Sequence, residues 1–366
     1  MTASPEDIRH MRAALALAAR GLGRTWPNPA VGCVIVKDGR VIGRGWTQPG
    51  GRPHAETEAL ARAGDAAQGA TAYVTLEPCS HHGRTPPCAE ALVKAGVARV
   101  VSALGDPDAR VDGAGHATLR KAGIAVETGV LESEAAEINA GFLLREREGR
   151  PLVTLKLATS LDGRIAMASG ESRWITGPEA RHAAHLLRAQ HDVVLIGSGT
   201  AMSDDPELTC RLPGFAAGLP VRAVLDRRYR LPMSSKLVRT ARQTPTWVLT
   251  APEAPQRNDL AAFGVERVQC DGSMAGALVA LAMRGITRVL AEGGAAVSAE
   301  LLKAGLVDRI VWFHAGKLIG GDGVPAVLPL AVPRLAGVPQ FHRSALNPVG
   351  ADMVSEWRRV DAPTRQ

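Results

Sequence analysis

Short apolar runs alternate with helix-like segments along the whole chain, and this alternation constrains its fold more than any other feature. In the first half, HAETEALARAG (54–64) precedes TAYVTL (71–76), and PCAEALVKAG (87–96) precedes VARVVSAL (97–104). Short apolar runs that alternate with helical patterns are typical of strands in an α/β sheet. We therefore predict an α/β fold, with a three-layer α/β/α arrangement in the first half.

A polar run, REREGRP (145–151), separates two such patterns. The chain has 366 residues, which exceeds the length of an average domain and suggests two. We predict domains at 1–148 and 149–366. The second is again α/β, with strands expected at LVTLKLA (152–158), DVVLIGSG (192–199) and VRAVLD (221–226). Helix is expected over 132–148 at the end of the first domain.

Composition narrows the setting in which the chain works. No apolar run approaches the roughly 18 residues that a membrane span requires, so no membrane partner is expected. The N-terminal stretch MTASPEDIRHMRAALALAARG is interrupted by charges and does not resemble a signal peptide. The five cysteines are an odd number without the spacing of a small disulfide scaffold, which favours reduced thiols in the cytoplasm.

The formal net charge of +7 is unevenly distributed. Acidic and basic residues balance within 1–148, so the excess falls in 149–366. A nucleic-acid partner would need a basic face, which the first domain lacks. The basic second domain suits a small phosphorylated ligand or cofactor, although a general surface charge for solubility explains it equally well.

The motif HAE (54–56), followed by PC (78–79) and a second cysteine, indicates zinc chemistry. One imidazole and two thiolates can hold zinc with a fourth position open to water, which the metal then activates. We predict that His54, Cys79 and Cys88 are the ligands, and that Glu56 moves protons between water and a leaving amine. Nucleobase deaminases carry this pattern as H-x-E and P-C-x-x-C.

The spacing between the cysteines departs from that pattern, with eight intervening residues instead of two. The inserted SHHGRTPP (80–87) suits a substrate mouth in which Arg84 and a histidine hold a phosphate. We expect His54 and Glu56 to open one helix. We also expect Cys79 to end a strand where a second helix begins, because helix N-termini favour thiolates.

Plainer explanations exist for each of these residues. His54 could simply start a helix, and Cys79 and Cys88 could be small buried hydrophobes. A structural zinc site would need a fourth ligand, for which His81 or His82 is available. The remaining cysteines, Cys33, Cys210 and Cys270, are expected in the core.

Longer motifs resemble one known family, the bifunctional riboflavin-biosynthesis deaminase/reductases. They include NPAVGCVIV (28–36), TAYVTLEPCSHHGRTPPC (71–88), LKLATSLDGRIAMASG (155–170) and LAEGGAAV (290–297). The resemblance extends from about residue 6 to about residue 324. It implies an N-terminal cytidine-deaminase-like domain that deaminates a phosphoribosylated diaminopyrimidinone. It also implies a dihydrofolate-reductase-like domain that uses NADPH to open the ribose into ribityl, and assembly into a homo-oligomer.

The family also implies a set of contact residues. In the first domain, the resemblance again implies that zinc is bound by His54, Cys79 and Cys88 and that Glu56 transfers protons. It also implies that the pyrimidine nucleotide contacts Asn28, His81 and Arg84. The reductase substrate is expected at Lys156, Ser172, Arg188, Leu208, Arg211 and Glu292. NADPH is expected at Ala158, Trp174, Thr200, Asp204 and the turn Gly293, Gly294, Ala295 and Ala296.

Several of these residues also have ordinary explanations. The turn at 293–296 precedes a helix, which suits a phosphate, yet a plain strand-to-helix turn fits as well. Lys156 lies in a strand pattern and could belong to an edge strand. Arg188 and Arg211 could be solvated surface charges, and Asn28 could be a turn residue between prolines. Arg227 and Arg228 follow a strand, where they could meet the 2′-phosphate of NADPH.

Two rival functions are compatible with parts of this pattern. The zinc motif alone would allow a nucleic-acid base deaminase with a fused accessory domain, which the balanced charge and the longer cysteine spacing disfavour. A non-catalytic, zinc-stabilised binding module is the second rival, and it requires four side-chain ligands. We predict the bifunctional enzyme, with zinc and NADPH as cofactors.

Overall fold

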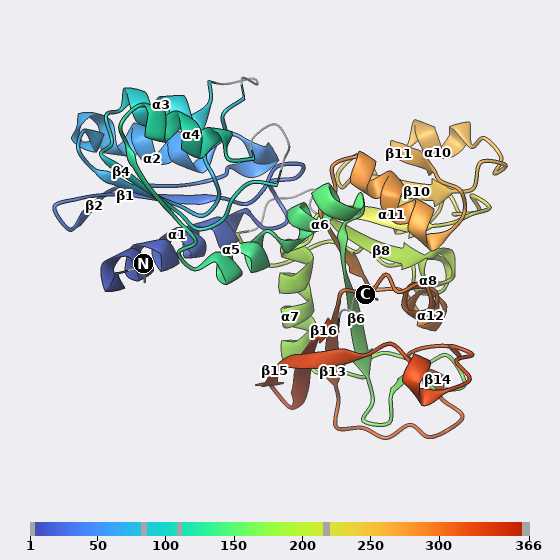
Figure 1. Cartoon of the computed structure of the whole chain (residues 1–366). Coiled ribbons are helices and arrows are strands. Elements are labelled where there is room, and N and C mark those ends of the chain that lie inside the picture. The colour runs from blue at the N-terminus through green and yellow to red at the C-terminus, as the bar shows by residue number, and fades with distance from the viewer. Residues whose placement is uncertain (1–3, 82–85, 108–111, 215–219, 361–366) are drawn as a thin grey trace. The chain divides into compact units, whose positions relative to one another are not determined.

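The computed structural model describes residues 4–81, 86–107, 112–214 and 220–360. The chain divides into two compact units, Met1–Arg150 and Pro151–Gln366, called here the N-terminal and C-terminal units (Figure 1). The division lies inside the polar run 145–151. Both units are α/β folds, as the alternating pattern predicts.

A five-stranded sheet forms the centre of the N-terminal unit, in the order β2-β1-β3-β4-β5. The hairpin of β1 and β2 turns at Asp38 and Gly39, which both have positive φ angles. β3 pairs with β1 in the antiparallel sense and with β4 in the parallel sense, and β5 is parallel to β4. The strands are β1 (Gly32–Lys37), β2 (Arg40–Trp46), β3 (Thr71–Val74), β4 (Arg99–Ser102) and β5 (Ala125–Thr128).

Helices cover both faces of this sheet, which confirms the predicted three layers (Figure 1). α2, α3 and α4 lie on one face and α1 and α5 on the other. The helices are α1 (Pro5–Ala18), α2 (Ala55–Ala63), α3 (Cys88–Lys94), α4 (Ala114–Lys121), α5 (Glu132–Ile138) and α6 (Ala140–Glu148). The segment 132–148 is therefore not one helix, because it breaks at Asn139.

Glycines let helices approach the first two strands closely. A Cβ atom on Gly45 would lie 2.1 Å from the carbonyl oxygen of Ala55, in the first turn of α2. A Cβ atom on Gly32 would lie 1.9 Å from the carbonyl oxygen of Ala14 in α1. Only glycine fits at such contacts, so the first turn of α2 can lie directly against β2 at Gly45.

A nine-stranded sheet forms the C-terminal unit, in the order β11-β10-β9-β8-β12-β6-β13-β16-β15. The first seven strands in this order are mutually parallel, and β16 and β15 add an antiparallel edge. These strands are β6 (Leu152–Thr159), β8 (Val193–Gly197), β9 (Val221–Leu225), β10 (Thr246–Thr250), β11 (Val265–Gln269), β12 (Arg288–Ala291), β13 (Arg309–His314), β15 (Phe341–Val349) and β16 (Asp352–Arg359). The short strands β7 (Arg164–Ala166) and β14 (Val324–Pro325) pair separately.

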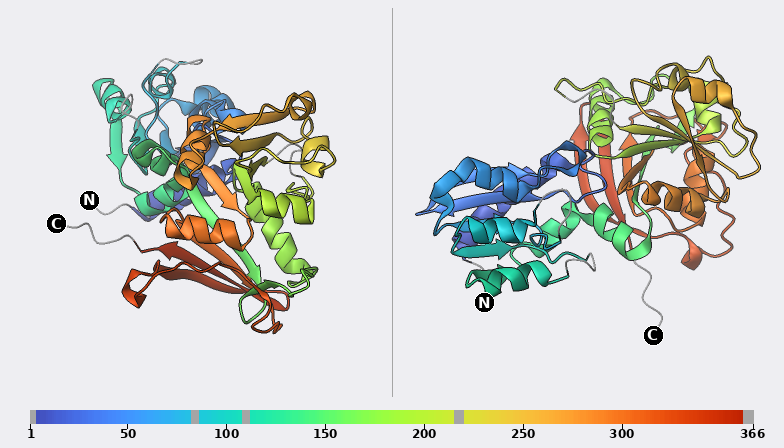
Figure 2. Two further views of the ribbon diagram at one scale, coloured as in Figure 1. Left: turned by 90° about the vertical axis from the view of Figure 1, so that its right-hand side faces the viewer. Right: turned by 90° about the horizontal axis from the view of Figure 1, so that it is seen from above.

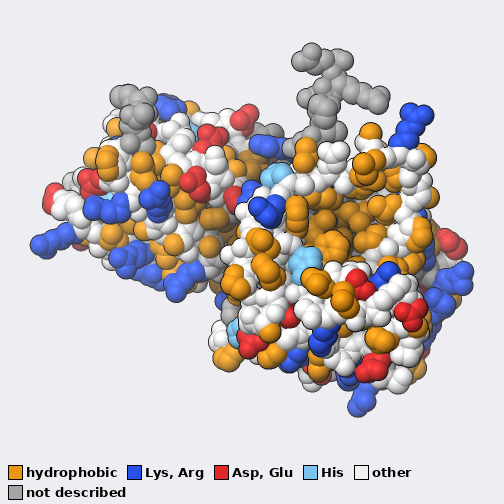
Figure 3. All heavy atoms as spheres, turned by 90° about the horizontal axis from the view of Figure 1, so that it is seen from below, with side chains coloured by type: hydrophobic (Ala, Val, Ile, Leu, Met, Phe, Trp, Pro, Cys, Tyr) orange, Lys and Arg blue, Asp and Glu red, His pale blue; other side chains and the backbone are white. Residues whose placement is uncertain are grey.

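Helices lie on both faces of the larger sheet (Figure 2). Leu237 and Leu260, from the short helices α9 and α10, pack with strand residues Val224 and Val248 in one core cluster, and Leu187 of α7 packs against it. The helices are α7 (Pro178–Ala189), α8 (Ser198–Asp204), α9 (Lys236–Arg239), α10 (Asn258–Ala262), α11 (Met274–Met283) and α12 (Ala295–Lys303). One face of the unit carries an apolar hollow bordered by charged side chains (Figure 3).

Within the described residues, none of the helices combines the length and apolar character needed to cross a membrane.

Candidate active sites

Three segments of the N-terminal unit bring the predicted metal ligands together. His54 immediately precedes α2, Cys79 lies in the segment after β3, and Cys88 is the first residue of α3. Nδ1 of His54 is 3.7 Å from Sγ of Cys79 and 3.3 Å from Sγ of Cys88. The three ligand atoms all lie within 4.8 Å of one another, which suits a single metal ion. Among the described residues this is the one cluster of its kind.

The two thiols have opposite pKa shifts. A hydrogen bond with Cys88 is the main cause that lowers the pKa of Cys79 to about 4, and His54 and the backbone N–H of Cys88, 3.3 Å away, add to it. The same bond and burial raise the pKa of Cys88. A divalent cation would displace the proton that the sulfurs share and hold both as thiolates. One nitrogen and two sulfurs are a donor set that zinc prefers.

Glu56 lies in the first turn of α2 and is only 3% exposed. Burial is the main cause that raises its pKa to about 7, and the charge of His54 acts in the opposite direction. A carboxyl group that exchanges its proton near neutral pH is suited to general acid–base work. The prediction that His54 and Glu56 begin a helix is confirmed.

The cluster opens into a cavity of about 300 Å³. Asn28 and His81, two of the residues expected at the pyrimidine nucleotide, line it with Glu56. Arg84, the third, lies outside the described residues, as does His82. Sequence reasoning missed a further group of lining residues, because no motif marks them: Arg52, Glu77, Asp106, Phe142, Arg145 and Glu146.

Three cysteine predictions need correction. Cys79 does not open a helix, because α3 begins nine residues later at Cys88, whose backbone N–H donates to the Cys79 sulfur. Cys33 is fully buried as expected, but Cys210 and Cys270 are only partly buried. Cys210 donates to the backbone oxygen of His185, and Cys270 lines a cavity described below. His81 is not part of the donor cluster.

A second cavity, of about 480 Å³, lies in the C-terminal unit. All six residues expected at the reductase substrate line it: Lys156, Ser172, Arg188, Leu208, Arg211 and Glu292. Three of the residues expected at NADPH line it too: Ala158, Trp174 and Asp204. The structure thus brings together residues that are more than a hundred positions apart in sequence.

Lys156, Arg188 and Glu292 form a buried charge cluster in this cavity. The guanidinium group of Arg188 donates to both Glu292 carboxylate oxygens, at 2.6 and 2.9 Å, and Nζ of Lys156 is 4.0 Å from Glu292. β6 lies between β12 and β13, so the edge-strand explanation for Lys156 is wrong. The surface-charge explanation is also wrong for Arg188, whose side chain is mostly buried. Arg211, by contrast, is 57% exposed and pairs with Glu207 at 3.1 Å.

Opposite effects set the pKa values in this cluster. Burial alone would raise the pKa of Glu292, but the charge and hydrogen bonds of Arg188, with the charge of Lys156, lower it to about 2. Burial lowers the pKa of Lys156, against the attraction of Glu292. Lys156 is therefore a better proton donor than an exposed lysine, held beside a fixed carboxylate.

The loop 205–211 forms one wall of the second cavity and is held by three other elements. Asp205 and Leu208 have φ angles of 41° and 55°, a conformation that costs free energy in residues other than glycine. Three hydrogen bonds hold this loop. The backbone N–H of Lys236 donates to the Asp205 carboxylate at 2.8 Å, Arg222 donates to the carbonyl oxygen of Glu207 at 3.2 Å, and Arg188 donates to the carbonyl oxygen of Thr209 at 3.0 Å. Arg222 is fully buried, and its partners are distant in sequence, so sequence reasoning missed it.

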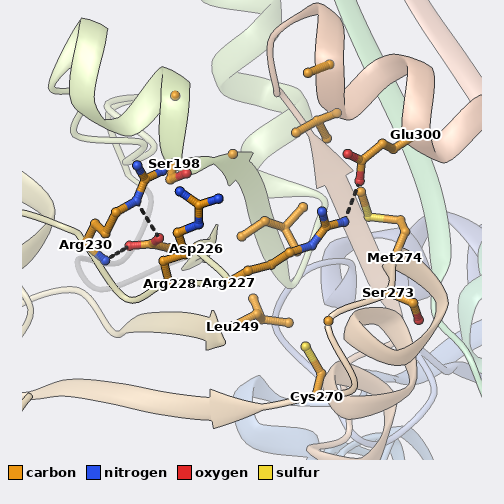
Figure 4. Close-up of a pocket in the computed structure, with 16 residues that line it drawn as sticks. Ser198, Asp226, Arg227, Arg228, Arg230, Leu249, Cys270, Ser273, Met274 and Glu300 are labelled. Atoms are coloured by element: carbon orange, nitrogen blue, oxygen red, sulfur yellow. Dashed lines mark hydrogen bonds and ion pairs between the residues drawn. The ribbon is translucent and has the colours of Figure 1, made fainter. Parts of the chain in front are cut away.

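A third cavity, of about 390 Å³, lies at the carboxyl ends of β8, β9 and β10 (Figure 4). Ligands of open α/β sheets bind at this edge. Arg227 and Arg228 line it, and Arg227 pairs with Glu300 at 2.9 Å. Figure 4 shows no interaction that reaches Arg228, and no partner is recorded for it among the described residues.

The predicted turn 293–296 lies beside this cavity, and Ala296 lines it. Gly294 precedes α12, and its backbone N–H donates to Oγ1 of Thr200 at 3.2 Å. Thr200 and the turn are therefore adjacent to each other but outside the second cavity. A Cβ atom on Gly293 would lie 2.6 Å from Cβ of Val297, which explains the glycine.

One unit holds the donor cluster beside a buried carboxylate, and the other is a mostly parallel sheet with two cavities that charged side chains line. Together these features define a zinc-dependent deaminase fused to a nucleotide-dependent reductase. Residues 4–104 match the cytidine and deoxycytidylate deaminase zinc-binding region, and residues 151–347 match the RibD C-terminal domain. The chain belongs to the RibD family of riboflavin biosynthesis proteins.

Curated relatives and solved structures agree with this assignment. The chain is 43% identical to riboflavin biosynthesis protein RibD of Escherichia coli, over 95% of this chain and 98% of that protein. It is 40% identical to RibD of Aquifex aeolicus, over 96% and 98%. The structure of Acinetobacter baumannii RibD superimposes with a TM-score of 0.89 at 41% identity, covering 97% of this chain and 99% of that one.

A Thermotoga maritima structure matches with a TM-score of 0.86 at 36% identity, over 97% and 99% of the two chains. It is described as a diaminohydroxyphosphoribosylaminopyrimidine deaminase/5-amino-6-(5-phosphoribosylamino)uracil reductase. The sequence-based prediction of a bifunctional deaminase and reductase of riboflavin biosynthesis, with zinc and NADPH as cofactors, is confirmed. So is the prediction of a dihydrofolate-reductase-like second half.

Glu292 should make the stability of the C-terminal unit pH-dependent. Its folded-state pKa of about 2 lies below the ordinary value of 4.5, so its stabilising effect is complete above 4.5 and is lost as the pH falls toward 2. The difference in unfolding free energy between wild type and Glu292→Gln should therefore be smaller at about pH 3 than at about pH 6. Denaturant unfolding at both pH values measures it, and an equal difference at both would contradict the assignment.

Proposed function

We propose that the N-terminal unit hydrolytically deaminates 2,5-diamino-6-(5-phosphoribosylamino)pyrimidin-4-one. The C-terminal unit then reduces the ribosyl side chain of 5-amino-6-(5-phosphoribosylamino)uracil to ribityl with NADPH. The domains are residues 1–148 and 149–366. One observation carries the proposal, namely three convergent donor atoms within 4.8 Å of one another beside a buried carboxyl group. The description of the Thermotoga maritima relative supports the choice of substrate.

In the first reaction, His54, Cys79 and Cys88 hold the zinc ion. When bound there, zinc supplies the Lewis acidity that makes water a nucleophile near neutral pH. A carboxylate oxygen of Glu56 takes a proton from this water and passes it to the amine nitrogen, which leaves as ammonia. Asn28, His81 and Arg84 contact the nucleotide and hold the reacting carbon in place.

In the second reaction, Lys156 donates a proton to the ribose ring oxygen as the bond from that oxygen to C1′ breaks and the ribosylamine opens to its iminium form. When bound, NADPH would supply the hydride that reduces C1′ and leaves the amine. Glu292, which Arg188 holds in turn, keeps the ammonium group of Lys156 in the cavity. Ser172, Leu208 and Arg211 position the rest of the substrate. Burial lowers the pKa of Lys156, which favours this proton transfer.

The second and third cavities would together hold NADPH. Ala158, Trp174 and Asp204, which line the second cavity, would contact its nicotinamide end. The backbone of Gly293, Gly294, Ala295 and Ala296, at the beginning of α12, suits the pyrophosphate together with Thr200. Arg228 is the better candidate for the 2′-phosphate, because Glu300 already pairs with Arg227.

The charge and the cysteines of the chain bear on its partners and on its cellular compartment. The balanced charge of residues 1–148 argues against a nucleic-acid partner, and base deamination of nucleic acid with a fused accessory domain is the alternative function. A non-catalytic zinc module would need a fourth side-chain ligand. We place the enzyme in the cytoplasm, on the evidence of its unpaired cysteines, and expect a homo-oligomer without a membrane partner.

The function is tested by supplying the purified enzyme with the diaminopyrimidinone nucleotide and NADPH. Ammonia and the nicotinamide absorbance are followed together. Ammonia release should precede NADPH oxidation, because the deaminated product is the second substrate. NADPH oxidation without ammonia, or ammonia from tRNA or single-stranded DNA instead, would contradict the proposal.

The Glu56→Gln variant should lose ammonia release by at least about 100-fold, because the amide cannot accept the proton. Zinc content should stay near one ion per chain. NADPH oxidation should remain at the wild-type rate when the deaminated nucleotide is supplied. A variant that still deaminates would show that Glu56 is not the proton carrier.

The Lys156→Ala variant should show the opposite pattern. Deamination should remain, while NADPH oxidation falls by at least about 100-fold, because no group protonates the ring oxygen. Both rates are measured on the same preparation. If the two activities fall equally, the variant is misfolded, and the matched Lys156→Met variant, which keeps most of the side-chain volume, repeats the test.

The Arg228→Ala variant should lose its preference for NADPH over NADH by about 10- to 100-fold in kcat/KM, the effect of one charge-assisted phosphate contact. Arg227→Ala is the matched control, and its preference should change much less because Glu300 already occupies that guanidinium group. The reverse ranking would assign the phosphate to Arg227.

A further inference from the structure

The segment 27–31 forms one wall of the cavity in the N-terminal unit. Pro27, Asn28, Pro29 and Val31 all line that cavity. The segment lies just before β1 and outside the pairing of that strand. Its position therefore depends on other contacts.

Side chains bind the backbone of this segment and of the next residue. The N–H of Val31 donates to Oγ1 of Thr47 at 3.0 Å, and the N–H of Gly32 donates to Oγ1 of Thr75 at 3.0 Å. Ala30 is held at both of its polar groups by one side chain, that of Asn139. Its N–H donates to Asn139 Oδ1 at 2.9 Å, and its carbonyl oxygen accepts from Asn139 Nδ2 at 3.1 Å.

Asn139 occupies the break between α5 and α6, and it is only 2% exposed. Its backbone oxygen accepts the N–H of Leu143, which begins the hydrogen bonding of α6. Its amide group can make both bonds to Ala30 in one orientation only, because the N–H needs an oxygen and the carbonyl needs a donor. A buried amide with both ends satisfied is rigid.

α6 forms a second wall of the same cavity. Phe142, Arg145 and Glu146 line it, at the spacing of three and four residues that shares one helix face. Nη1 of Arg145 donates to the carbonyl oxygen of Pro27 at 3.2 Å, so the two walls also meet at a more exposed point. Asn139 is not among the lining residues and acts only through its neighbours.

Asn28, two residues before Ala30, links this wall to the segment that leads into the donor cluster. Its Nδ2 donates to the carbonyl oxygen of Gly51 at 2.9 Å, three residues before His54. A Cβ atom on Gly51 would lie 2.2 Å from Nδ2 of Asn28, so the contact is close. A shift of Ala30 would therefore move the Asn28 side chain relative to the donor cluster.

We propose that Asn139 is a positioning residue for deamination. It fixes the segment that carries Asn28 to the beginning of α6, and so sets the separation of the two walls between which the pyrimidine nucleotide binds. The proposal rests on the proposed function of the N-terminal unit. It also explains why a polar residue, Asn139, interrupts a segment that the sequence predicts as one continuous helix.

Steady-state deamination by wild type, Asn139→Ala, Asn28→Ala and the double variant tests the proposal. Asn139→Ala should raise KM for the nucleotide about tenfold and change kcat less than about threefold, because the two hydrogen bonds that position the 27–31 wall are lost while the reacting groups are kept. The double variant should resemble Asn28→Ala, since the two residues act in one path. NADPH oxidation of the deaminated nucleotide and zinc content should stay unchanged.

Tyr73→Phe is the matched control. It removes another hydrogen bond of the same unit, from the Tyr73 hydroxyl to Asp7 at 3.0 Å, away from the cavity. Its KM should equal that of wild type. A wild-type KM in Asn139→Ala, or a double variant whose KM increase is the product of the two single increases, would overturn the proposal.

A second variant covers the case in which Asn139→Ala fails to fold. Asn139→Asp keeps the size of the side chain and the oxygen that accepts from Ala30, but puts a second oxygen against the Ala30 carbonyl group. It should also raise KM more than kcat changes, and a wild-type KM would overturn the proposal. If wild type itself released no ammonia, the proposed function would fail, which is a separate outcome.

Discussion

The convergence of one imidazole and two sulfur atoms is the constraint on which the N-terminal unit depends. His54, Cys79 and Cys88 belong to three different segments, so they come together only when α2 and α3 are correctly packed on the sheet. Gly45 lets the first turn of α2, which follows His54 directly, lie against the sheet. The same approach buries Glu56, and burial gives its carboxyl group a proton affinity near neutrality.

The C-terminal unit depends on a comparable arrangement of charge. Glu292 stabilises the charged form of Lys156 in a central strand, and Glu292 is held in turn by Arg188. The loop 205–211 brings Leu208 and Arg211 to the same cavity in a conformation that Arg222, Arg188 and α9 maintain. Each unit therefore keeps its reactive groups in place through buried polar contacts between segments distant in sequence.

The sequence predicted the strand and helix alternation well, because each element carries its own apolar pattern. It did not predict the break at Asn139, since its side chain bonds to Ala30, 109 positions away. It also missed β15 and β16, because β15 is mostly exposed and neither strand contains an apolar run. Motifs indicated His54, Cys79, Cys88 and Lys156, whereas cavity residues such as Phe142 and Arg145 have no local signal and are known only from packing.

The claim that the metal keeps one position free of side chains is tested most directly by X-ray absorption at the zinc edge of the purified, zinc-loaded enzyme. We expect two sulfur neighbours at about 2.3 Å and two lighter neighbours at about 2.0 Å, of which only one is an imidazole. A spectrum with two imidazoles, or with more than two sulfurs, would mean that side chains saturate the metal, and the assignment of the N-terminal unit as a catalytic deaminase would be wrong.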